Sequence, residues 1–236
     1  MLSCFWNVPI LGYHRIGEPK GDHVPTVTPE SFEKQMAFLA RRRYRVMSLD
    51  DCVRKVAAGE PFSPRSVVIT FDDGYEETLT IAAPLLHQHG FCATVFVTPG
   101  EVGYPGFMTW DQVRQIAQNG FTVGSHTMHH TYLPMTACEK VRRELAESKQ
   151  ILEQQLSRPI QWLSYPVGGY TPAIQALARE VGYRAACTTN RGVSKWARDL
   201  FALRRIKMTE RDGNPALMQF KLSGYYDLFR RLGEPA

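Results

Sequence analysis

Long apolar runs are missing from this sequence of 236 residues. None reaches the roughly 18 residues that a transmembrane helix needs, so we expect no integral membrane segment. Residues 1–16, MLSCFWNVPILGYHRI, also lack the basic start and the long apolar core of a secretory signal peptide. We therefore expect a cytoplasmic protein, or a secreted or periplasmic one if the chain is a trimmed form.

Cysteines at metal-binding or redox spacing are absent as well. The five cysteines are Cys4, Cys52, Cys92, Cys138 and Cys187. No two of them form a CxxC pattern. An odd, scattered set argues against a disulfide framework and against a cysteine-based structural zinc site. Single cysteines of this kind are typical of buried apolar positions or of a reducing compartment.

A continuous basic stripe is a third absence. The net charge is +5, which favours anionic partners in general. The densest basic clusters, RRRYR at residues 41–45 and FRRLGEP at residues 229–235, are not interleaved with a series of stacking aromatics. We therefore expect no nucleic-acid partner, and the sequence does not indicate an oligomeric state.

What is present is an alternation of apolar strands with amphipathic helices, each delimited by capping residues, glycine or proline. The expected strands cover residues 8–14, 66–71, 91–99, 121–126, 160–166 and 183–189. The expected helices cover residues 28–43, 48–60, 76–90, 109–120, 136–156 and 171–182, with closing helices at 214–222 and 224–232. This order predicts a single α/β domain of parallel strands covered by helices, either a barrel or an open sheet.

Polar side chains follow several of these strands where each strand ends. They are His14, Asp72, Asp73, His126, Tyr165 and Pro166. In parallel α/β folds the catalytic groups gather at the carboxyl ends of strands, so we expect these residues to share one rim. The alternative is a set of unrelated solvated turns.

Asp72 and Asp73 are adjacent carboxylates at the end of the apolar run VVITF, an arrangement that is costly unless a cation is near. GSHTMHH, residues 124–130, supplies His126 and His130 four positions apart. If this segment forms a helical turn, both imidazoles lie on one face, while His129 points elsewhere. Two histidines and one aspartate would hold a divalent ion, and the second aspartate would act as base for a water that the ion activates. A surface turn is the alternative.

TFDDG at residues 70–74 followed by SHTMHH at residues 125–130 resembles the polysaccharide deacetylase family, carbohydrate esterase family 4 with the NodB homology domain. The resemblance covers residues 8–210, approximately, and is nearest to the poly-N-acetylglucosamine deacetylase branch. It implies a distorted (β/α) barrel and the metal-dependent removal of N-acetyl groups from sugars. Zinc is the expected ion, with cobalt, nickel or iron as alternatives.

By this resemblance Asp72 is the general base, and Asp73, His126 and His130 are the metal ligands. The two histidines match the family's HTxxH pattern, and Thr127 matches its hydroxyl position, where it would anchor the loop of the first histidine. Arginine is missing from the third motif, because SYPVGGY at residues 164–170 has Ser164 in its place. We expect Arg205, or alternatively Arg204, to orient the base instead.

The family's C-terminal histidine is missing too, since no histidine follows residue 130. In the branch named above, an N-terminal strand carries the equivalent residue, so His14 is the candidate acid; a core histidine bonded to a carbonyl is the alternative. Tyr165 and Pro166 would line the groove, with backbone amides after Tyr165 contributing to an oxyanion hole.

Aromatic residues are expected at a sugar site because pyranose faces stack on rings. Trp196 and Asp199 are loose matches to family positions near the site. Trp110, Tyr165 and Trp162 are alternatives for stacking.

The sequence therefore predicts a metal-dependent hydrolase acting on N-acetylglucosamine-type glycans or glycan intermediates. Two alternatives stay open: the same fold acting on a ureide or formylated sugar, and a non-catalytic glycan-binding protein.

Overall fold

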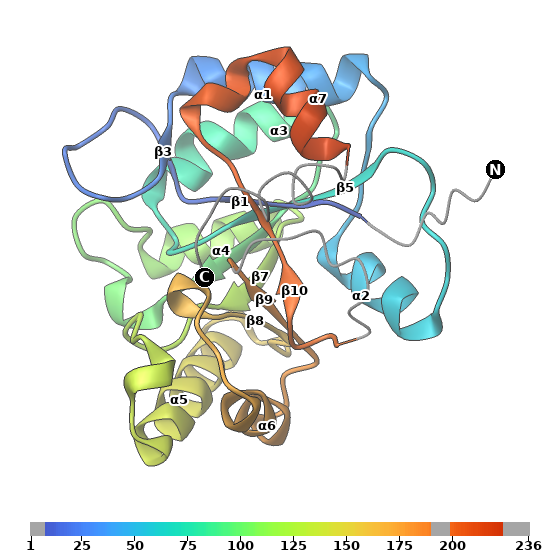
Figure 1. Cartoon of the computed structure of the whole chain (residues 1–236). Helices are drawn as coiled ribbons and strands as arrows, with labels where there is room; N and C mark the ends of the chain where they lie inside the picture. The colour runs from blue at the N-terminus through green and yellow to red at the C-terminus, as the bar shows by residue number, and fades with distance from the viewer. Residues whose placement is uncertain (1–7, 190–198, 224–236) are drawn as a thin grey trace.

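The computed structural model describes residues 8–189 and 199–223. Strand and helix alternate along the chain as the sequence pattern predicts (Figure 1). The expected helix at residues 224–232 lies outside the described residues, as does Trp196.

Within the described part of the chain, nine strands form one parallel sheet in the order β10-β9-β8-β7-β6-β5-β1-β11, with β4 paired to the start of β5. Its strands are β1 (Ile10–Tyr13), β4 (Arg45–Val46), β5 (Ser66–Phe71), β6 (Thr94–Val97), β7 (Thr122–Ser125), β8 (Trp162–Ser164), β9 (Ala185–Thr188), β10 (Leu203–Arg204) and β11 (Ile206–Lys207). A small parallel pair, β2 (Arg15–Ile16) and β3 (Thr26–Val27), lies beside it.

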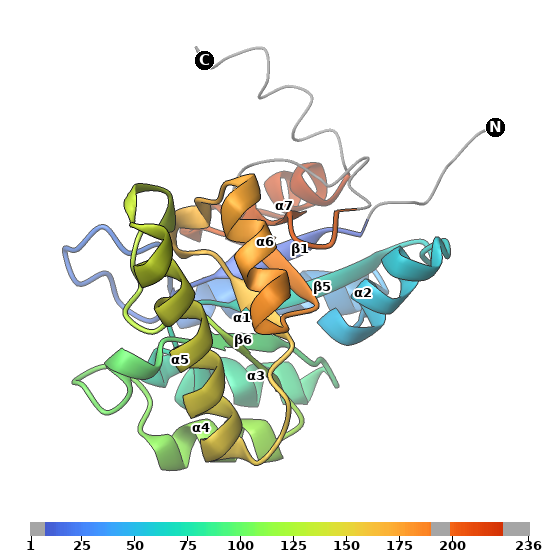
Figure 2. The same ribbon diagram turned by 90° about the horizontal axis from the view of Figure 1, so that it is seen from below.

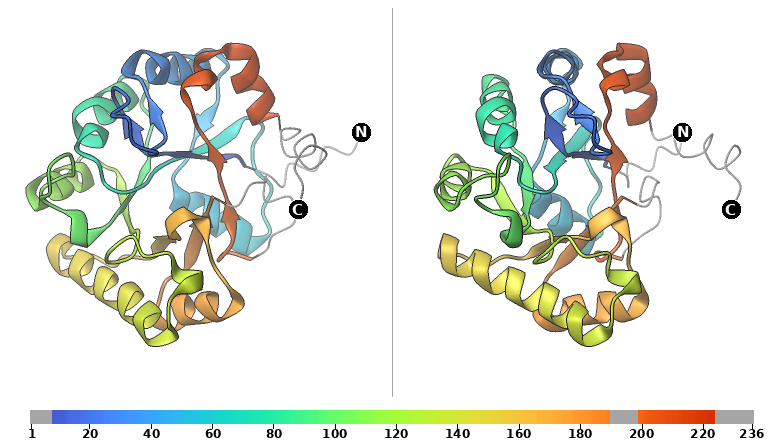
Figure 3. Two further views of the ribbon diagram at one scale, coloured as in Figure 1. Left: turned by 60° about the vertical axis from the view of Figure 1, so that its left-hand side comes forward. Right: turned by 90° about the vertical axis from the view of Figure 1, so that its left-hand side faces the viewer.

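The sheet closes on itself through one segment, residues 203–207. Its first part, β10, pairs with β9, and its second part, β11, pairs with β1. Arg205 is the residue between the two parts, and its amide donates to the Thr188 carbonyl at 3.1 Å. The resulting ring of strands is seen end-on in the left-hand view of Figure 3, with helices around it. The predicted distorted (β/α) barrel is confirmed.

Helices cover the strands (Figure 2). They are α1 (Pro29–Arg41), α2 (Leu49–Ala58), α3 (Ala83–Gln88), α4 (Trp110–Gln118), α5 (Cys138–Leu156), α6 (Pro172–Val181) and α7 (Pro215–Leu222). All but α2 lie on the outside of the ring, whereas α2 packs its buried residues into the cluster inside the barrel. Short 3-10 turns are η2 (Pro99–Glu101), η3 (Leu133–Met135), η4 (Pro166–Gly168) and η5 (Glu210–Gly213). Among the helices of the described ranges, none combines the length and apolar character needed to cross a membrane.

Capping side chains start most of these helices where the sequence predicts. Thr28, Ser48 and Thr109 each accept a backbone hydrogen bond from the first turn of the following helix. The helix expected at residues 76–90 differs in detail, because a π-helical turn, η1 (Thr78–Ala82), precedes α3. Pro84 stands in the first turn of α3, where its missing N–H is not needed, so it begins this helix and does not interrupt it.

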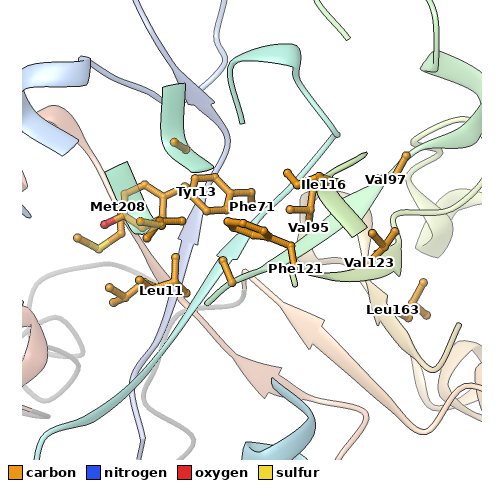
Figure 4. Packing of buried hydrophobic residues seen from close by; sticks show 14 of the residues in the cluster. Leu11, Tyr13, Phe71, Val95, Val97, Ile116, Phe121, Val123, Leu163 and Met208 are labelled. Carbon is orange, nitrogen blue, oxygen red and sulfur yellow. The ribbon is translucent and has the colours of Figure 1, made fainter. Parts of the chain in front are cut away.

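Residues of each strand alternate between the interior of the barrel and the helices outside. One buried cluster packs under the helices and includes Leu11, Tyr13, Phe71, Val95 and Val123 (Figure 4). A second cluster fills the barrel and takes the intervening positions, among them Ile10, Val68, Phe96, Trp162 and Leu203. Every second residue of a strand faces the interior, and these positions are called the interior series. Toward the carboxyl ends of the strands, the series reaches His14, Asp72, Ser164 and Arg205 at the rim.

Candidate active site

Asp72 lies at the end of β5 on the interior series and is 1% exposed. Its amide donates to the Tyr13 carbonyl of the adjacent strand at 2.9 Å. Asp73 and Gly74 then adopt positive φ angles of 73° and 82°, which turn the chain sharply after the strand. Gly74 suits this left-handed backbone, whereas Asp73 adopts it as one of the few residue types that tolerate it.

Arg205 forms a bidentate ion pair with Asp72 through both terminal nitrogens of its guanidinium group. The Arg205 Nη1 donates to Asp72 Oδ1 at 2.7 Å, and Nη2 donates to Oδ2 at 2.5 Å. Nη2 also donates to the Ser164 hydroxyl at 2.9 Å, and Nη1 to the Thr70 hydroxyl at 3.1 Å. Of the two arginines considered from sequence, Arg205 therefore contacts the carboxylate, and Ser164 occupies the position where the family motif has arginine.

This ion pair keeps Asp72 charged in a buried place. Burial alone would raise the pKa of Asp72, but the charges of Arg205 and His126 hold it well below its ordinary value. Burial likewise opposes the charge on Arg205, whose pKa is nevertheless raised by Asp72. The repulsion expected between Asp72 and Asp73 is thus offset on one side by Arg205.

Asp73, His126 and His130 converge on one point. The Asp73 Oδ1 lies 3.3 Å from His126 Nε2 and 3.5 Å from His130 Nε2. One ligand atom from each of these residues lies within 4.8 Å of the other two. These are the three side chains that the sequence proposes as metal ligands, and the role of ligand stays a prediction.

The hydrogen bonds around these residues fit a bound cation. The His126 ring places Nδ1 2.8 Å from the Ser164 carbonyl, which can only accept, so Nδ1 carries a proton and Nε2 faces Asp73. The Asp73 Oδ1 is buried and has no hydrogen-bond partner among the described residues. Two electron-pair acceptors so close together need a cation or an added proton between them.

The electrostatics of His126 agree with this need. Burial would lower its pKa, yet the carboxylates of Asp72 and Asp73 raise it above the ordinary value. A divalent ion satisfies both acceptors in place of that proton, and two imidazoles with one carboxylate suit zinc, cobalt, nickel or iron.

The loop from His126 to His130 is irregular, so the helical turn considered from sequence is wrong. Thr127 and His130 have φ angles of 64° and 53°, which a right-handed helix does not allow. The His126 amide donates to the Val97 carbonyl at 2.8 Å and so continues the sheet pairing. The rings of His126 and His130 come to 4.9 Å between centroids through this loop geometry instead.

Thr127 does not anchor the loop in the way expected. Its hydroxyl is buried without a hydrogen-bond partner among the described residues. The anchoring hydroxyl is that of Ser125, which accepts from the Thr127 amide at 3.2 Å.

His14 follows β1 and is 18% exposed at its side chain. Its Nε2 lies 3.9 Å from Asp72 Oδ2, on the same rim as the three convergent residues. Burial is the largest influence on His14 and lowers its pKa, although the nearby carboxylates act in the opposite sense. The ring is therefore neutral near pH 7.

The substrate-contacting role expected for the Tyr165 ring is wrong. Tyr165 is 0% exposed and stacks on Tyr170 at 5.3 Å between ring centroids. The reason is strand alternation: Ser164 faces the barrel interior, so the next side chain points under the helices. Pro166 is also buried and begins η4.

Two of the backbone amides after Tyr165 already donate hydrogen bonds within the turn. Gly168 and Gly169 donate to the Tyr165 and Pro166 carbonyls within the turn. The oxyanion role therefore stays a prediction for the amide of Val167 alone, a residue with φ of 56° that is exposed at the rim.

Other residues considered from sequence lie away from the rim or outside the described residues. Asp199 accepts hydrogen bonds from Gln175 and Arg179 of α6, so it has a structural role. Trp162 is buried inside the barrel and Trp110 packs partly buried against the outer core. The placement of Trp196 stays a prediction.

The role of Ser164 was not found from sequence, where it appeared only as a departure from the family motif. Its hydroxyl accepts a hydrogen bond from the Arg205 side chain. The available signal was the two-residue alternation of a strand, which places Ser164 on the interior face.

Comparisons with known proteins agree with this geometry. Residues 59–186, more than half of the chain, match the sequence profile described as polysaccharide deacetylase. YxkH of Bacillus subtilis, described provisionally as a polysaccharide deacetylase, is 29% identical over 203 residues, covering 86% of this chain and 72% of that protein. A peptidoglycan-N-acetylglucosamine deacetylase of Bacillus cereus is 32% identical over 126 residues, covering 52% of this chain and only 56% of that protein.

Among solved structures, the Streptococcus pyogenes deacetylase PplD in complex with acetate is similar over nearly its full length. The TM-score is 0.85 at 26% sequence identity, covering 92% of this chain and 98% of PplD.

Proposed function

This chain belongs to the polysaccharide deacetylase family, and we propose that it is a metal-dependent hydrolase that removes N-acetyl groups from N-acetylglucosamine-type glycans. The observation that carries the proposal is the approach of the Asp73 Oδ1 to both His126 Nε2 and His130 Nε2 beside an ionised Asp72. The glycan class is supported by the name of the Bacillus cereus relative.

In this proposal Asp73, His126 and His130 hold the divalent ion, with zinc expected first. When bound, such an ion polarises the acetyl carbonyl and lowers the pKa of a water beside it. The Ser164 carbonyl fixes the His126 ring so that Nε2 is presented to the ion.

Asp72 acts as the general base that takes the proton of the attacking water. Arg205 keeps it ionised and fixes both of its oxygens. Because the pKa of Asp72 is held well below its ordinary value, the carboxylate releases the acquired proton readily.

His14 is the proposed route of that proton to the leaving nitrogen. It is neutral at rest because burial lowers its pKa, so it must gain a proton during the cycle before it donates one. Asp72, 3.9 Å away, is the nearby source. The water proton then passes from Asp72 to His14 and on to the amine as the C–N bond breaks, leaving acetate and a free amino sugar.

The test is acetate release from N-acetylglucosamine oligomers by the wild type, by Asp72→Asn and by the wild type with chelator. We expect release by the wild type only, with activity restored when zinc, cobalt or nickel is returned after chelation. The loss in Asp72→Asn should be about 10²–10⁴-fold, the contribution typical of a general base.

The other outcomes separate the alternatives. If stoichiometric metal is bound but no acetate appears, the substrate is a different amide, such as a ureide or formylated sugar. If neither metal nor turnover is found, the hydrolase proposal is rejected and a glycan-binding protein becomes the favoured hypothesis.

A further inference from the structure

The chain on both sides of His130 is bonded to one buried carboxylate. Glu144 lies in α5 and is 3% exposed. It accepts from the His129 amide at 2.9 Å through one oxygen, and the other oxygen lies 3.0 Å from His129 Nδ1. The side chain of Thr131 is a further hydrogen-bond partner of the same carboxylate. Glu144 therefore holds the residue before and the residue after a candidate metal ligand.

His130 needs this support more than His126 does. His126 is fixed by its amide on the Val97 carbonyl and by its ring on the Ser164 carbonyl. His130 has a side chain that is 41% exposed and a backbone in the left-handed region, at φ of 53°. That conformation is unfavourable for a residue with a Cβ, so the surrounding contacts must maintain it.

A second contact limits the same loop from the other side. The Gly100 amide donates to the Met128 carbonyl at 2.9 Å. A Cβ at Gly100 would lie 2.5 Å from that oxygen, so only glycine permits this approach. Residues 128–131 are thus held between the η2 turn and α5.

The His129 ring takes part in this support through its contact with Glu144. His129 precedes His130 in sequence, yet its Nδ1 lies beside Glu144, and His129 is not one of the residues that converge with Asp73. Burial would raise the pKa of Glu144, but hydrogen bonds from the His129 side chain and backbone lower it, so the carboxylate is ionised near neutral pH. An ionised acceptor makes stronger hydrogen bonds than a neutral one.

We propose that Glu144 is a positioning residue for the metal site, which holds residues 129–131 so that the His130 Nε2 stays within reach of Asp73 and His126. The inference rests on the proposed function in one respect, that these three residues bind a divalent ion. It makes no use of the glycan substrate.

The test measures the ion directly. Apparent Kd values for Zn²⁺ are obtained by competition with a chromophoric chelator, and the visible spectrum of bound Co²⁺ reports the ligand geometry. We expect Glu144→Ala to weaken Zn²⁺ binding about 10–100-fold, the range typical when residues that support metal ligands are removed, and to change the Co²⁺ spectrum. Glu144→Gln keeps an acceptor and should lose less.

His129→Ala separates the two contacts, because it removes the ring and leaves the amide bonded to Glu144. We expect a smaller loss of affinity than in Glu144→Ala, and no further loss when both changes are combined. Glu147→Gln is the matched control, since Glu147 is an exposed residue of the same helix, and it should leave Kd unchanged.

The proposal is overturned if Glu144→Ala and His129→Ala both bind Zn²⁺ as the wild type does while their circular dichroism stays native. If Glu144→Ala does not fold, Glu144→Gln and His129→Ala decide the matter by the same criterion. A wild type that binds neither ion rejects the metal site and the proposed function with it. Tight binding by the wild type without acetate release rejects the proposed substrate but leaves the positioning role standing.

Discussion

At the scale of single residues, the two neighbouring aspartates differ in their partners. Asp72 is paired with Arg205 inside the barrel, whereas the buried Asp73 Oδ1 lies near two imidazoles and has no hydrogen-bond partner in the described part of the chain. Sequence proposed this division of roles through a family motif. The structure adds the reason why both can be charged at once, which is an arginine on one and a place for a cation on the other.

Replacing Arg205 by lysine should shift the acid limb of the rate profile. Lysine keeps the positive charge but cannot form the bidentate hydrogen bonds, so the pKa of Asp72 should rise toward its ordinary value. A base works only when ionised, and it is lost as pH falls through its pKa. The acid limb of kcat/KM should therefore move to higher pH in Arg205→Lys.

The measurement is a pH profile of kcat/KM under metal saturation. Arg204→Lys is the control, because Arg204 is half-buried in β10 and is not the arginine bonded to Asp72. An acid limb that stays in place in Arg205→Lys would show that this ion pair does not set the ionisation of Asp72.

Removing the His14 ring should lower kcat without changing the amount of bound Zn²⁺. His14→Ala is expected to lower kcat about 10²–10⁴-fold, as removal of a general acid does. The Zn²⁺ content should stay at the wild-type level, because His14 is not one of the three convergent ligands. An unchanged kcat would instead support the reading of His14 as a core histidine.

At the scale of elements, the segment 203–207 connects the two ends of the sheet and delivers Arg205 into the barrel. The alternation of strands and helices along the chain was readable from sequence because β-branched and apolar runs alternate with capped helices. The segment 203–207 is short, and β1, one of its partner strands, is distant in sequence, so its pairing could not be predicted from local sequence patterns. The same holds for the loop at residues 126–130, whose left-handed residues replaced the helical turn considered from spacing.

Strand β7 requires a glycine at its centre. A Cβ at Gly124 would lie 2.6 Å from the Phe96 ring and 2.9 Å from the Trp162 carbonyl, so neighbours on both sides would have to move. We expect Gly124→Ala to destabilise the protein by about 1–3 kcal/mol, as overpacking in a core does. Chemical denaturation measures this change.

Gly17→Ala is the control for that comparison, because the nearest atom to its added Cβ is 3.8 Å away. Gly17 is also buried, but its added methyl group would meet only ordinary van der Waals contacts, so Gly17→Ala should lower the free energy of unfolding less than Gly124→Ala does. Equal stability of Gly124→Ala and the wild type would mean that β6 and β8 can separate at no cost.

At the scale of the whole molecule, the candidate ligands come from the loops after β5 and β7, so an ion would join separate parts of the barrel. A ligand that binds only the folded state stabilises it, by about 2.7 kcal/mol when present at 100 times its Kd. Zn²⁺ should therefore raise the Tm of the chelator-treated wild type, and the rise should be absent in Asp73→Asn. A Tm that does not respond to Zn²⁺, Co²⁺ or Ni²⁺ would contradict the metal site.

The sequence by itself determined the alternation of β1 and β5 to β9 with helices, several of the helix caps, and the side chains at the strand ends. These follow from local rules: periodicity, capping and the two-residue alternation of a strand. The motif residues Asp72, Asp73, His126 and His130 could be singled out because they stand together in short segments.

Only the tertiary structure decided which arginine faces the base, where Tyr165 points and what supports His130. Arg205 meets Asp72 across 133 residues of sequence, through closure of the sheet. Tyr165 is buried because its strand register turns it outward under the helices, and Glu144 reaches His129 from α5. Each of these contacts depends on how distant elements pack, and no local pattern in the chain specifies that packing.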